Sequence, residues 1–295
     1  MNKLHEVTVN NSEHSVLVSA PNSSKSTEKP EVIFTQAWSA GIRAPYQAER
    51  ANLLSELTDR VIITPNTPGQ GEGSVDLTDE QKEELRAGHA WKLGAFAINM
   101  ALAVIDEDAR TTRKDLLASS QGTLLIPGEL RELYSRDIDV PHVIMSTPGS
   151  SSSEGPFATA RLRANMALLG GIGLNSERSH NPDSLQGLRD TNIFVDPAKN
   201  SQLLNHIVRY PHALAHQDLA AELGETIGDH RTSVTILAGE DDRVSKLKEN
   251  ERLHERLVKY GVDSELIAVE GSHTIAENVP NFAKLVKKAL DKNKN

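Results

Sequence analysis

The chain has 295 residues, of which 38% are hydrophobic and 25% charged, a composition typical of a folded globular protein rather than a disordered one. The formal net charge of -9 predicts repulsion from nucleic acid and anionic lipid, and the absence of cysteine excludes disulfides, thiol nucleophiles and thiolate metal ligands. Neither a signal-peptide pattern nor a run of about 18 apolar residues is present, so we expect a cytoplasmic protein without a transmembrane helix.

The predicted elements alternate between strands and helices along the chain. Two short β-branched segments come first and predict a hairpin, because Asn10-Asn11 separates residues 5–9 from residues 15–19. Further strands are predicted at 31–36, 59–64, 114–119, 139–146, 233–238 and 265–269. Helices are predicted at 44–58, 77–106 (as one or two helices), 121–134 and 281–292. Pro127-Gly128 should kink or break the third of these. Such alternation favours an α/β fold with a mostly parallel sheet covered by helices on both faces.

The alternation is interrupted once, between the strand ending at residue 146 and the one beginning at residue 233. This interval of roughly 85 residues is far longer than an ordinary connection. It contains helical patterns at 158–169, 201–208 and 213–227. We therefore predict a helical cap at 148–231, inserted into a core formed by residues 1–147 and 232–295.

A candidate nucleophile lies where the predicted strand 114–119 ends. The sequence there is Ala118-Ser119-Ser120-Gln121-Gly122, so an apolar strand leads through small-x-Ser-x-Gly into a helical pattern. A serine at such a sharp turn is strained and held clear of the backbone, and the small flanking residues let neighbouring chain pass close by. The motif alone is equally consistent with a Ser/Gly turn that has no chemical role.

A candidate acid and a candidate base follow two later strands. The strand at 233–238 leads to Asp242, and the strand at 265–269 leads to His273. A serine hydroxyl needs a base to take its proton and an acid to orient that base. The order Ser120, Asp242, His273, each at the carboxyl end of a strand, is far more specific than any single motif. Glu240 and Asp241 are weaker alternatives for the acid.

These three segments together resemble the α/β-hydrolase superfamily over nearly the whole chain. The family's Gly-x-x-Asp element matches Asp242, its Gly-x-His element matches His273, and its Pro-Gly-x-Gly-x-Ser loop is similar to residues 68–74, with one extra residue. The resemblance implies an eight-stranded sheet with a cap, and an oxyanion hole formed by the backbone N–H groups of Trp38 and Gln121. The sequence departs from the family at Gln36-Ala37, where His-Gly is usual, and at Ala118, where Gly is usual.

We therefore expect a serine hydrolase that forms an acyl-enzyme on Ser120 and acts on a carboxylic ester of a small molecule. The alternatives are an amide, a thioester or a carbon–carbon bond as the cleaved bond, or a non-catalytic small-molecule-binding protein on the same scaffold. The mechanism needs no cofactor and no metal. The expected partner is a small-molecule substrate, without nucleic acid or membrane, and the oligomeric state is open, a homo-oligomer included.

Other histidines receive structural interpretations. His212 and His216 have the i, i+4 spacing of a zinc-binding helix face, but no third ligand of matching spacing follows, so a solvated or cap-packing role is favoured. His142 lies inside a predicted strand and is expected in the core or at an edge.

Overall fold

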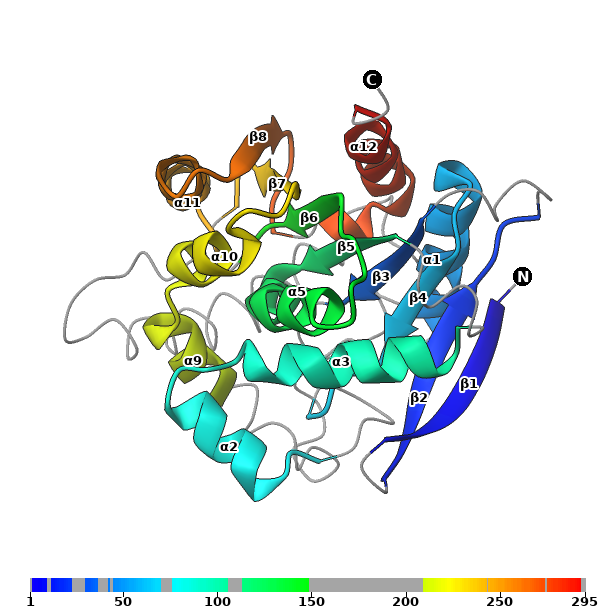
Figure 1. The fold of residues 1–295 in the computed structure, drawn as a ribbon. Coiled ribbons are helices and arrows are strands. Elements are labelled where there is room, and N and C mark those ends of the chain that lie inside the picture. The colour runs from blue at the N-terminus through cyan, green and yellow to red at the C-terminus, as the bar shows by residue number, and fades with distance from the viewer. Residues whose placement is uncertain are drawn as a thin grey trace.

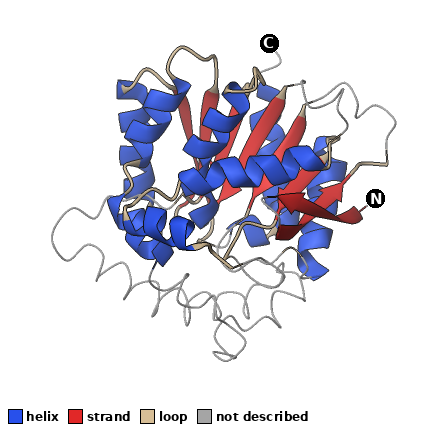
Figure 2. Ribbon diagram, turned by 60° about the horizontal axis from the view of Figure 1, so that its bottom comes forward, coloured by secondary structure: helices blue, strands red, loops and turns tan. Residues whose placement is uncertain are grey.

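The chain forms an eight-stranded sheet with helices on both faces (Figures 1 and 2). The computed structural model describes residues 2–9, 12–22, 30–36, 42, 45–69, 76–105, 113–148, 209–242, 244–273 and 275–292. The strand order is β1-β2-β4-β3-β5-β6-β7-β8. The strands are β1 (Asn2–Val9), β2 (Ser12–Ser19), β3 (Glu31–Thr35), β4 (Ile62–Pro65), β5 (Lys114–Ser119), β6 (His142–Ser146), β7 (Ser233–Gly239) and β8 (Asp263–Val269).

The sheet is mostly parallel, as the sequence predicts. Strands β3 to β8 are paired in parallel, whereas β1 and β2 form an antiparallel hairpin in which Asn2 pairs with Ser19 and Val9 with Ser12. β2 joins this hairpin to the rest of the sheet by antiparallel pairing with β4. The predicted hairpin and the predicted α/β class are therefore confirmed.

The helices divide between the two faces of the sheet. They are α1 (Pro45–Thr58), α2 (Asp79–Arg86), α3 (Lys92–Ala103), η2 (Ser120–Leu125), α5 (Ile126–Tyr134), α9 (Tyr210–His216), α10 (Leu219–Ile227), α11 (Leu247–Lys259), η5 (Ile275–Glu277) and α12 (Val279–Lys292). Helices α3, α5, α10 and α11 share a core cluster with one face, and α1 and α12 share a second cluster with the other. In Figure 1, α3 and α5 lie in front of the sheet.

The central strands are buried on both sides because each contributes to both clusters. All six residues of β5 are buried, with Leu116 and Ala118 in one cluster and Leu117 in the other. Successive side chains of a strand point to opposite faces, so a continuous apolar run suits a strand covered on both sides. This burial holds the carboxyl end of β5, and the serine that follows it, in one position.

The helices agree with the predicted patterns in most places. The pattern over 77–106 forms two helices, because α2 has its own capping box of Thr78 and Gln81 and ends before residue 92. After Ser120 the chain forms one 3₁₀ segment and then α5, in which Pro127 occupies the first turn, where proline is tolerated. The predicted break is therefore a change of helix type ahead of the proline. Helix α11 was not predicted.

The predicted cap lies largely outside the described residues, which resume at Arg209. The described end of the range contains α9 and α10, and Leu219, Leu223 and Ile227 of α10 belong to the same core cluster as the sheet. α10 packs on α5 and α11 in this cluster. An inserted cap at 148–231 stays a prediction. Within the described part of the chain, no helix is both long and apolar enough to cross a bilayer.

Candidate active site

Ser120 is the first residue of η2, directly after β5, and its backbone is strained. Its φ is 50°, in the left-handed region that non-glycine residues avoid. Gly122 lies so close to the end of β3 that a Cβ built on it would be 2.6 Å from the carbonyl oxygens of Thr35 and Gln36. The predicted sharp turn and the close approach of neighbouring chain at the small residue are both present. A strained backbone held by buried surroundings is characteristic of functional sites.

His273 reaches Ser120 from the loop after β8. The Ser120 Oγ and the His273 Nε2 are 2.8 Å apart, which is a hydrogen-bond distance. The loop turns at Gly271, whose φ of 131° suits glycine, so the chain reverses directly after the strand. The His273 side chain is only 10% exposed. Two residues separated by 153 positions are thus brought into contact at the carboxyl ends of the strands that precede them.

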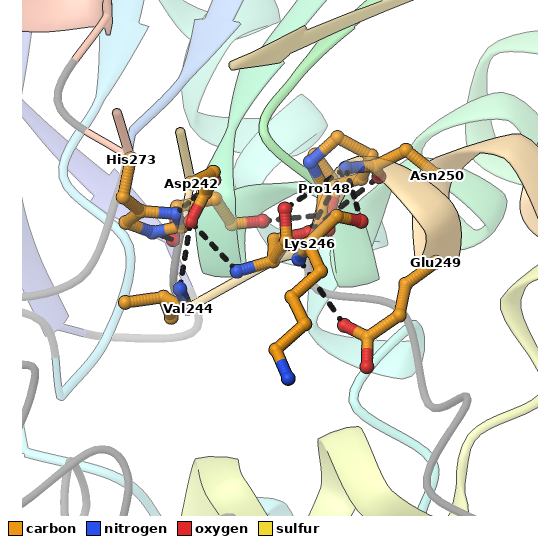
Figure 3. Close-up of polar contacts among 10 residues, drawn as sticks. Pro148, Asp242, Val244, Lys246, Glu249, Asn250 and His273 are labelled. Atoms are coloured by element: carbon orange, nitrogen blue, oxygen red, sulfur yellow. Dashed lines mark hydrogen bonds and ion pairs between the residues drawn. The ribbon is translucent and has the colours of Figure 1, made fainter. Parts of the chain in front are cut away.

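Asp242 holds the other side of the His273 ring. The Asp242 Oδ2 lies 2.8 Å from the His273 Nδ1, and its side chain is fully buried. Its Oδ1 accepts hydrogen bonds from the backbone N–H groups of Val244 and Ser245, at 2.8 Å each (Figure 3). The carboxylate oxygens are therefore both engaged, and the ring is held with Nδ1 toward the acid and Nε2 toward the serine. Glu240 and Asp241, the alternatives for the acid, are exposed.

The loops that carry the acid and the base pack directly on each other. A Cβ on Gly239, at the end of β7, would lie 2.6 Å from the carbonyl oxygen of Ser272. The acid loop is tied at its other end as well, because the Ser245 hydroxyl donates to the carbonyl of Pro148 and the Asn250 amide donates to the carbonyl of Ser245. Figure 3 shows Pro148 and Asn250 beside this loop. These contacts fix the position of Asp242 relative to the sheet.

The arrangement is suited to moving a proton from the serine. A carboxylate beside Nδ1 keeps the proton of the neutral ring on that atom, so Nε2 carries the lone pair that faces the Ser120 hydroxyl. When Nε2 accepts the serine proton, the same carboxylate stabilises the positive ring. The geometry can therefore convert a weak nucleophile into a reactive one.

Only one of the two predicted oxyanion donors lies in the described part of the chain. Trp38 and Ala37 lie outside the described residues. Gln121 is described and is 5% exposed, directly after Ser120 at the start of η2. Gln36 is buried and its side-chain oxygen accepts a hydrogen bond from the buried guanidinium of Arg50. The role of the Trp38 and Gln121 N–H groups stays a prediction.

The remaining histidines have structural surroundings. His142 is a buried core residue of β6, and its ring contacts the hydroxyls of Ser233 and Thr235 at 2.8 and 3.1 Å. His212 and His216 lie together on α9 with ring centroids 4.3 Å apart, and the His212 Nε2 lies 2.9 Å from the carbonyl oxygen of Arg86. Among the described residues, no cluster of three or more metal-ligating side chains occurs.

Sequence reasoning missed one buried acid near this site. Glu129 of α5 is fully buried, and its carboxyl accepts a hydrogen bond from the Thr35 hydroxyl. Burial raises the pKa of Glu129 to about 8, and the hydrogen bond from Thr35 opposes this rise. A sequence signal did exist, since Glu129 stands four residues from both Leu125 and Leu133 and so falls on the apolar face of the helix.

The fold has many counterparts among solved structures. A 2-hydroxy-6-oxo-6-phenylhexa-2,4-dienoate hydrolase of a Rhodococcus species is 14% identical with a TM-score of 0.63, over 99% of this chain and 100% of that one. A serine hydrolase of Cycloclasticus zankles is 10% identical with a TM-score of 0.62, over 100% of both chains. A monoacylglycerol lipase of Paleococcus ferrophilus is 17% identical with a TM-score of 0.59, over 95% of this chain and 99% of that one.

Neither of the two sequence comparisons finds a match. No protein-family model matches the chain, and no curated protein matches it in sequence. The structural likeness at such low identity establishes the architecture, so the resemblance inferred from the sequence motifs is confirmed for the fold.

Proposed function

We propose that this chain, which has the α/β-hydrolase fold, is a serine hydrolase that cleaves a carboxylic ester of a small molecule through an acyl-enzyme. The observation that carries the proposal is the hydrogen-bonded line from the Ser120 hydroxyl through the His273 ring to the Asp242 carboxylate. A protein with a purely structural role does not need three side chains hydrogen-bonded in this order. It also lies at the carboxyl ends of parallel strands, where open α/β sheets bind ligands.

In the first half of the reaction, the Ser120 Oγ bonds to the substrate carbonyl carbon while His273 Nε2 takes the serine proton. The carbonyl oxygen becomes an oxyanion, which the backbone N–H groups of Trp38 and Gln121 stabilise. Removing one donor from such a hole typically costs about 3 kcal/mol of transition-state stabilisation. The carbonyl then re-forms, the C–O bond to the alcohol breaks, and His273 gives its proton to the departing oxygen.

In the second half, water replaces the alcohol. His273 takes a proton from the water as its oxygen bonds to the acyl carbon. The bond to Ser120 Oγ then breaks, the serine recovers its proton from His273, and the carboxylic acid leaves. Throughout, Asp242 orients the ring and stabilises it while it is charged.

The ester is preferred over other bonds because of the nucleophile and the structural neighbours. An aspartate nucleophile would suit dehalogenase or epoxide-hydrolase chemistry, whereas Ser120 suits acyl transfer. The similar structures include proteins described as an esterase from Thermogutta terrifontis and a monoacylglycerol lipase, and these favour an ester here. Others are described as a thioesterase domain and an enol-lactonase, so a thioester and a lactone belong in the same substrate screen.

The direct test is labelling with a fluorophosphonate, read by intact-mass spectrometry. The wild-type protein should gain one phosphonyl group, because an activated serine oxygen displaces fluoride from phosphorus. Ser120→Ala should gain none. The matched control is Ser119→Ala, which removes the neighbouring buried hydroxyl and should label like the wild type. A folded wild-type protein that fails to label would overturn the proposal and favour the non-catalytic binding protein.

The class of bond is tested with p-nitrophenyl acetate and butyrate, the corresponding thioesters and anilides. We expect the wild-type protein to turn over the esters and Ser120→Ala to lose this activity. Turnover of the anilides with kcat/KM above that of the esters would contradict the ester assignment while leaving the serine mechanism in place.

A further inference from the structure

Glu129 is a fully buried carboxyl with a single hydrogen-bond partner among the described residues. Its Oε1 accepts a hydrogen bond from the Thr35 hydroxyl, and its Oε2 has no partner there. Thr35 is itself fully buried. Glutamate is almost never fully buried without a counter-charge, because removing a charged carboxylate from water is very costly. Burial of Glu129 with Thr35 as its one described partner is therefore an unusual feature of α5.

The location of the pair connects the two segments that flank the nucleophile. Thr35 is the last residue of β3, and the chain continues from it through Gln36 to Trp38. Glu129 belongs to α5, which continues without interruption from η2, the segment that begins with Ser120 and Gln121. The bond between the two side chains thus joins the strand that precedes one predicted oxyanion donor to the helix that follows the other.

The backbone between these elements is already in close contact. A Cβ on Gly122 would collide with the carbonyl oxygens of Thr35 and Gln36, and a Cβ on Gly94 of α3 would lie 2.6 Å from the Glu129 nitrogen. The backbone of α5 at Glu129 is therefore packed directly on α3, and the turn after Ser120 is packed directly on the end of β3. A change in the charge or size of the Glu129 side chain would be transmitted to η2 and to the end of β3, because neither can yield independently.

We propose that Glu129, through its bond to Thr35, is a positioning residue that holds the end of β3 against η2 and so fixes the backbone N–H group of Gln121 beside Ser120. This proposal rests on the proposed function, because it concerns the geometry of that same oxyanion hole. Glu129 touches neither Ser120 nor His273 in any contact described above, and it acts through β3 and η2.

The other charged groups around α5 have partners of their own or face solvent. On α5 itself, Arg131 pairs with Glu222 of α10 and Glu132 pairs with Arg136. On the neighbouring elements, Lys92 of α3 pairs with Glu84, Glu31 of β3 pairs with Lys114, and His273, beyond η2, pairs with Asp242, whereas Glu225 of α10 is exposed. Burial, the main cause, raises the pKa of Glu129 to about 8.

Ionisation of Glu129 should slow the reaction at alkaline pH. Glu129 keeps its proton in the folded protein up to about pH 8. Above that pH it ionises in a buried site where none of the described residues places a cation beside it, so the β3–η2 packing should open and the reaction should slow. An amide at this position has nearly the same shape, can still bond to Thr35 and does not titrate.

The test compares wild type, Glu129→Gln and the control Glu132→Gln, a half-buried glutamate of the same helix. The readouts are kcat for p-nitrophenyl butyrate and the rate of fluorophosphonate labelling, each from pH 6 to pH 10. For wild type and Glu132→Gln we expect both rates to fall above about pH 8, by about tenfold per pH unit. Glu129→Gln should lack this alkaline limb. The same limb in Glu129→Gln would overturn the proposal.

A second pair of variants covers the outcome in which Glu129→Gln does not fold. Thr35→Val removes the hydroxyl at nearly constant volume, and Thr35→Ser keeps it. We expect Thr35→Val to lower kcat about tenfold at pH 7.5 with KM unchanged, because oxyanion donors act in the transition state, and Thr35→Ser to restore most of it. Equal kcat in the two variants would refute the positioning role.

The outcomes also separate this proposal from the proposed function. If the folded wild-type protein neither labels nor hydrolyses any ester at any pH, the serine hydrolase proposal fails and the positioning role falls with it. If the wild type labels and hydrolyses, but Glu129→Gln and Thr35→Val behave like it at every pH, only the positioning role is refuted.

Discussion

Gly122 passes so close to Thr35 that a Cβ on Gly122 would lie 2.6 Å from the Thr35 carbonyl oxygen. This contact holds the turn after Ser120 against the end of β3. It explains in physical terms why a residue without a side chain stands two positions after the candidate nucleophile, and it leads to the first prediction.

Gly122→Ala should damage both stability and activity. The added methyl would meet backbone atoms that cannot rotate away, so η2 must shift, at a cost of about 1–3 kcal/mol in unfolding free energy. A displacement of the nucleophile by a fraction of an ångström to 1 Å should lower kcat/KM about 100-fold. Urea unfolding and ester hydrolysis measure the two effects.

The matched control for this variant is Gly261→Ala. Gly261 differs from Gly122 in having a positive φ, of 81°, and a Cβ there would meet nothing within 4 Å. It should lose about 1 kcal/mol of stability and keep full activity. Wild-type activity in a folded Gly122→Ala protein would show that the close approach to β3 does not matter for the site.

Asp242→Asn should preserve the fold and abolish most of the activity. The asparagine oxygen can still accept the N–H groups of Val244 and Ser245, which leaves the amide NH₂ facing His273 Nδ1. That donor favours the ring tautomer with its proton on Nε2, which cannot accept the serine proton. We expect kcat to fall about 10³- to 10⁴-fold. Steady-state hydrolysis of p-nitrophenyl butyrate checks this, and Asp241→Asn, an exposed neighbour, should retain activity.

The buried ion pair of Arg60 and Asp115 should behave differently when broken and when replaced. Both side chains are almost fully buried at the start of β5, away from Ser120. Arg60→Met leaves a buried carboxyl without its partner and should cost about 3–5 kcal/mol of unfolding free energy. The double variant Arg60→Met with Asp115→Leu should recover most of that loss. Urea denaturation measures both, and additive losses in the double variant would argue against the pair.

His142 should make the protein sensitive to acid. Burial, with a smaller contribution from the nearby Arg60 charge, lowers the pKa of His142 from 6.5 to about 4. Below pH 6.5 the unfolded chain binds a proton that the folded protein does not, so stability present above pH 6.5 is lost as the pH falls toward 4. The loss should be about 3 kcal/mol.

The measurement for His142 is urea unfolding of wild type and His142→Asn between pH 7 and pH 4. Because asparagine does not titrate, the stability of the variant relative to wild type should rise by about 3 kcal/mol over this range. A constant difference between the two proteins would mean that His142 binds its proton equally well in both states.

Much of this architecture could be predicted because it depends on local patterns. The six strands β3 to β8 are short apolar runs, and each was expected within a few residues of its observed bounds. The helix α11 was missed. Its sequence is dominated by charged residues, and only Leu253 and Leu257 of its apolar positions are well buried with Asn250. Its few apolar residues do recur on one face, but the low overall hydrophobicity of the segment hid this amphipathic pattern.

The close contacts could not be predicted from such patterns. Residues 240 to 242 are three acids in a row, and only the folded loop decides that Asp242 faces His273 while its neighbours face solvent. The same holds for Glu129, whose place on the apolar face of its helix indicates burial, whereas only the packing of α5 against β3 brings its carboxyl to Thr35.

The sequence by itself determined the alternation of strands and helices and the chain order of Ser120, Asp242 and His273, because hydrophobic periodicity and turn residues act over a few neighbouring positions. The tertiary structure alone decided which atoms meet: the 2.8 Å contacts among these three side chains and the bond between Glu129 and Thr35. Such contacts join residues tens to more than a hundred positions apart, and only the packing of the whole sheet with its helices brings them together.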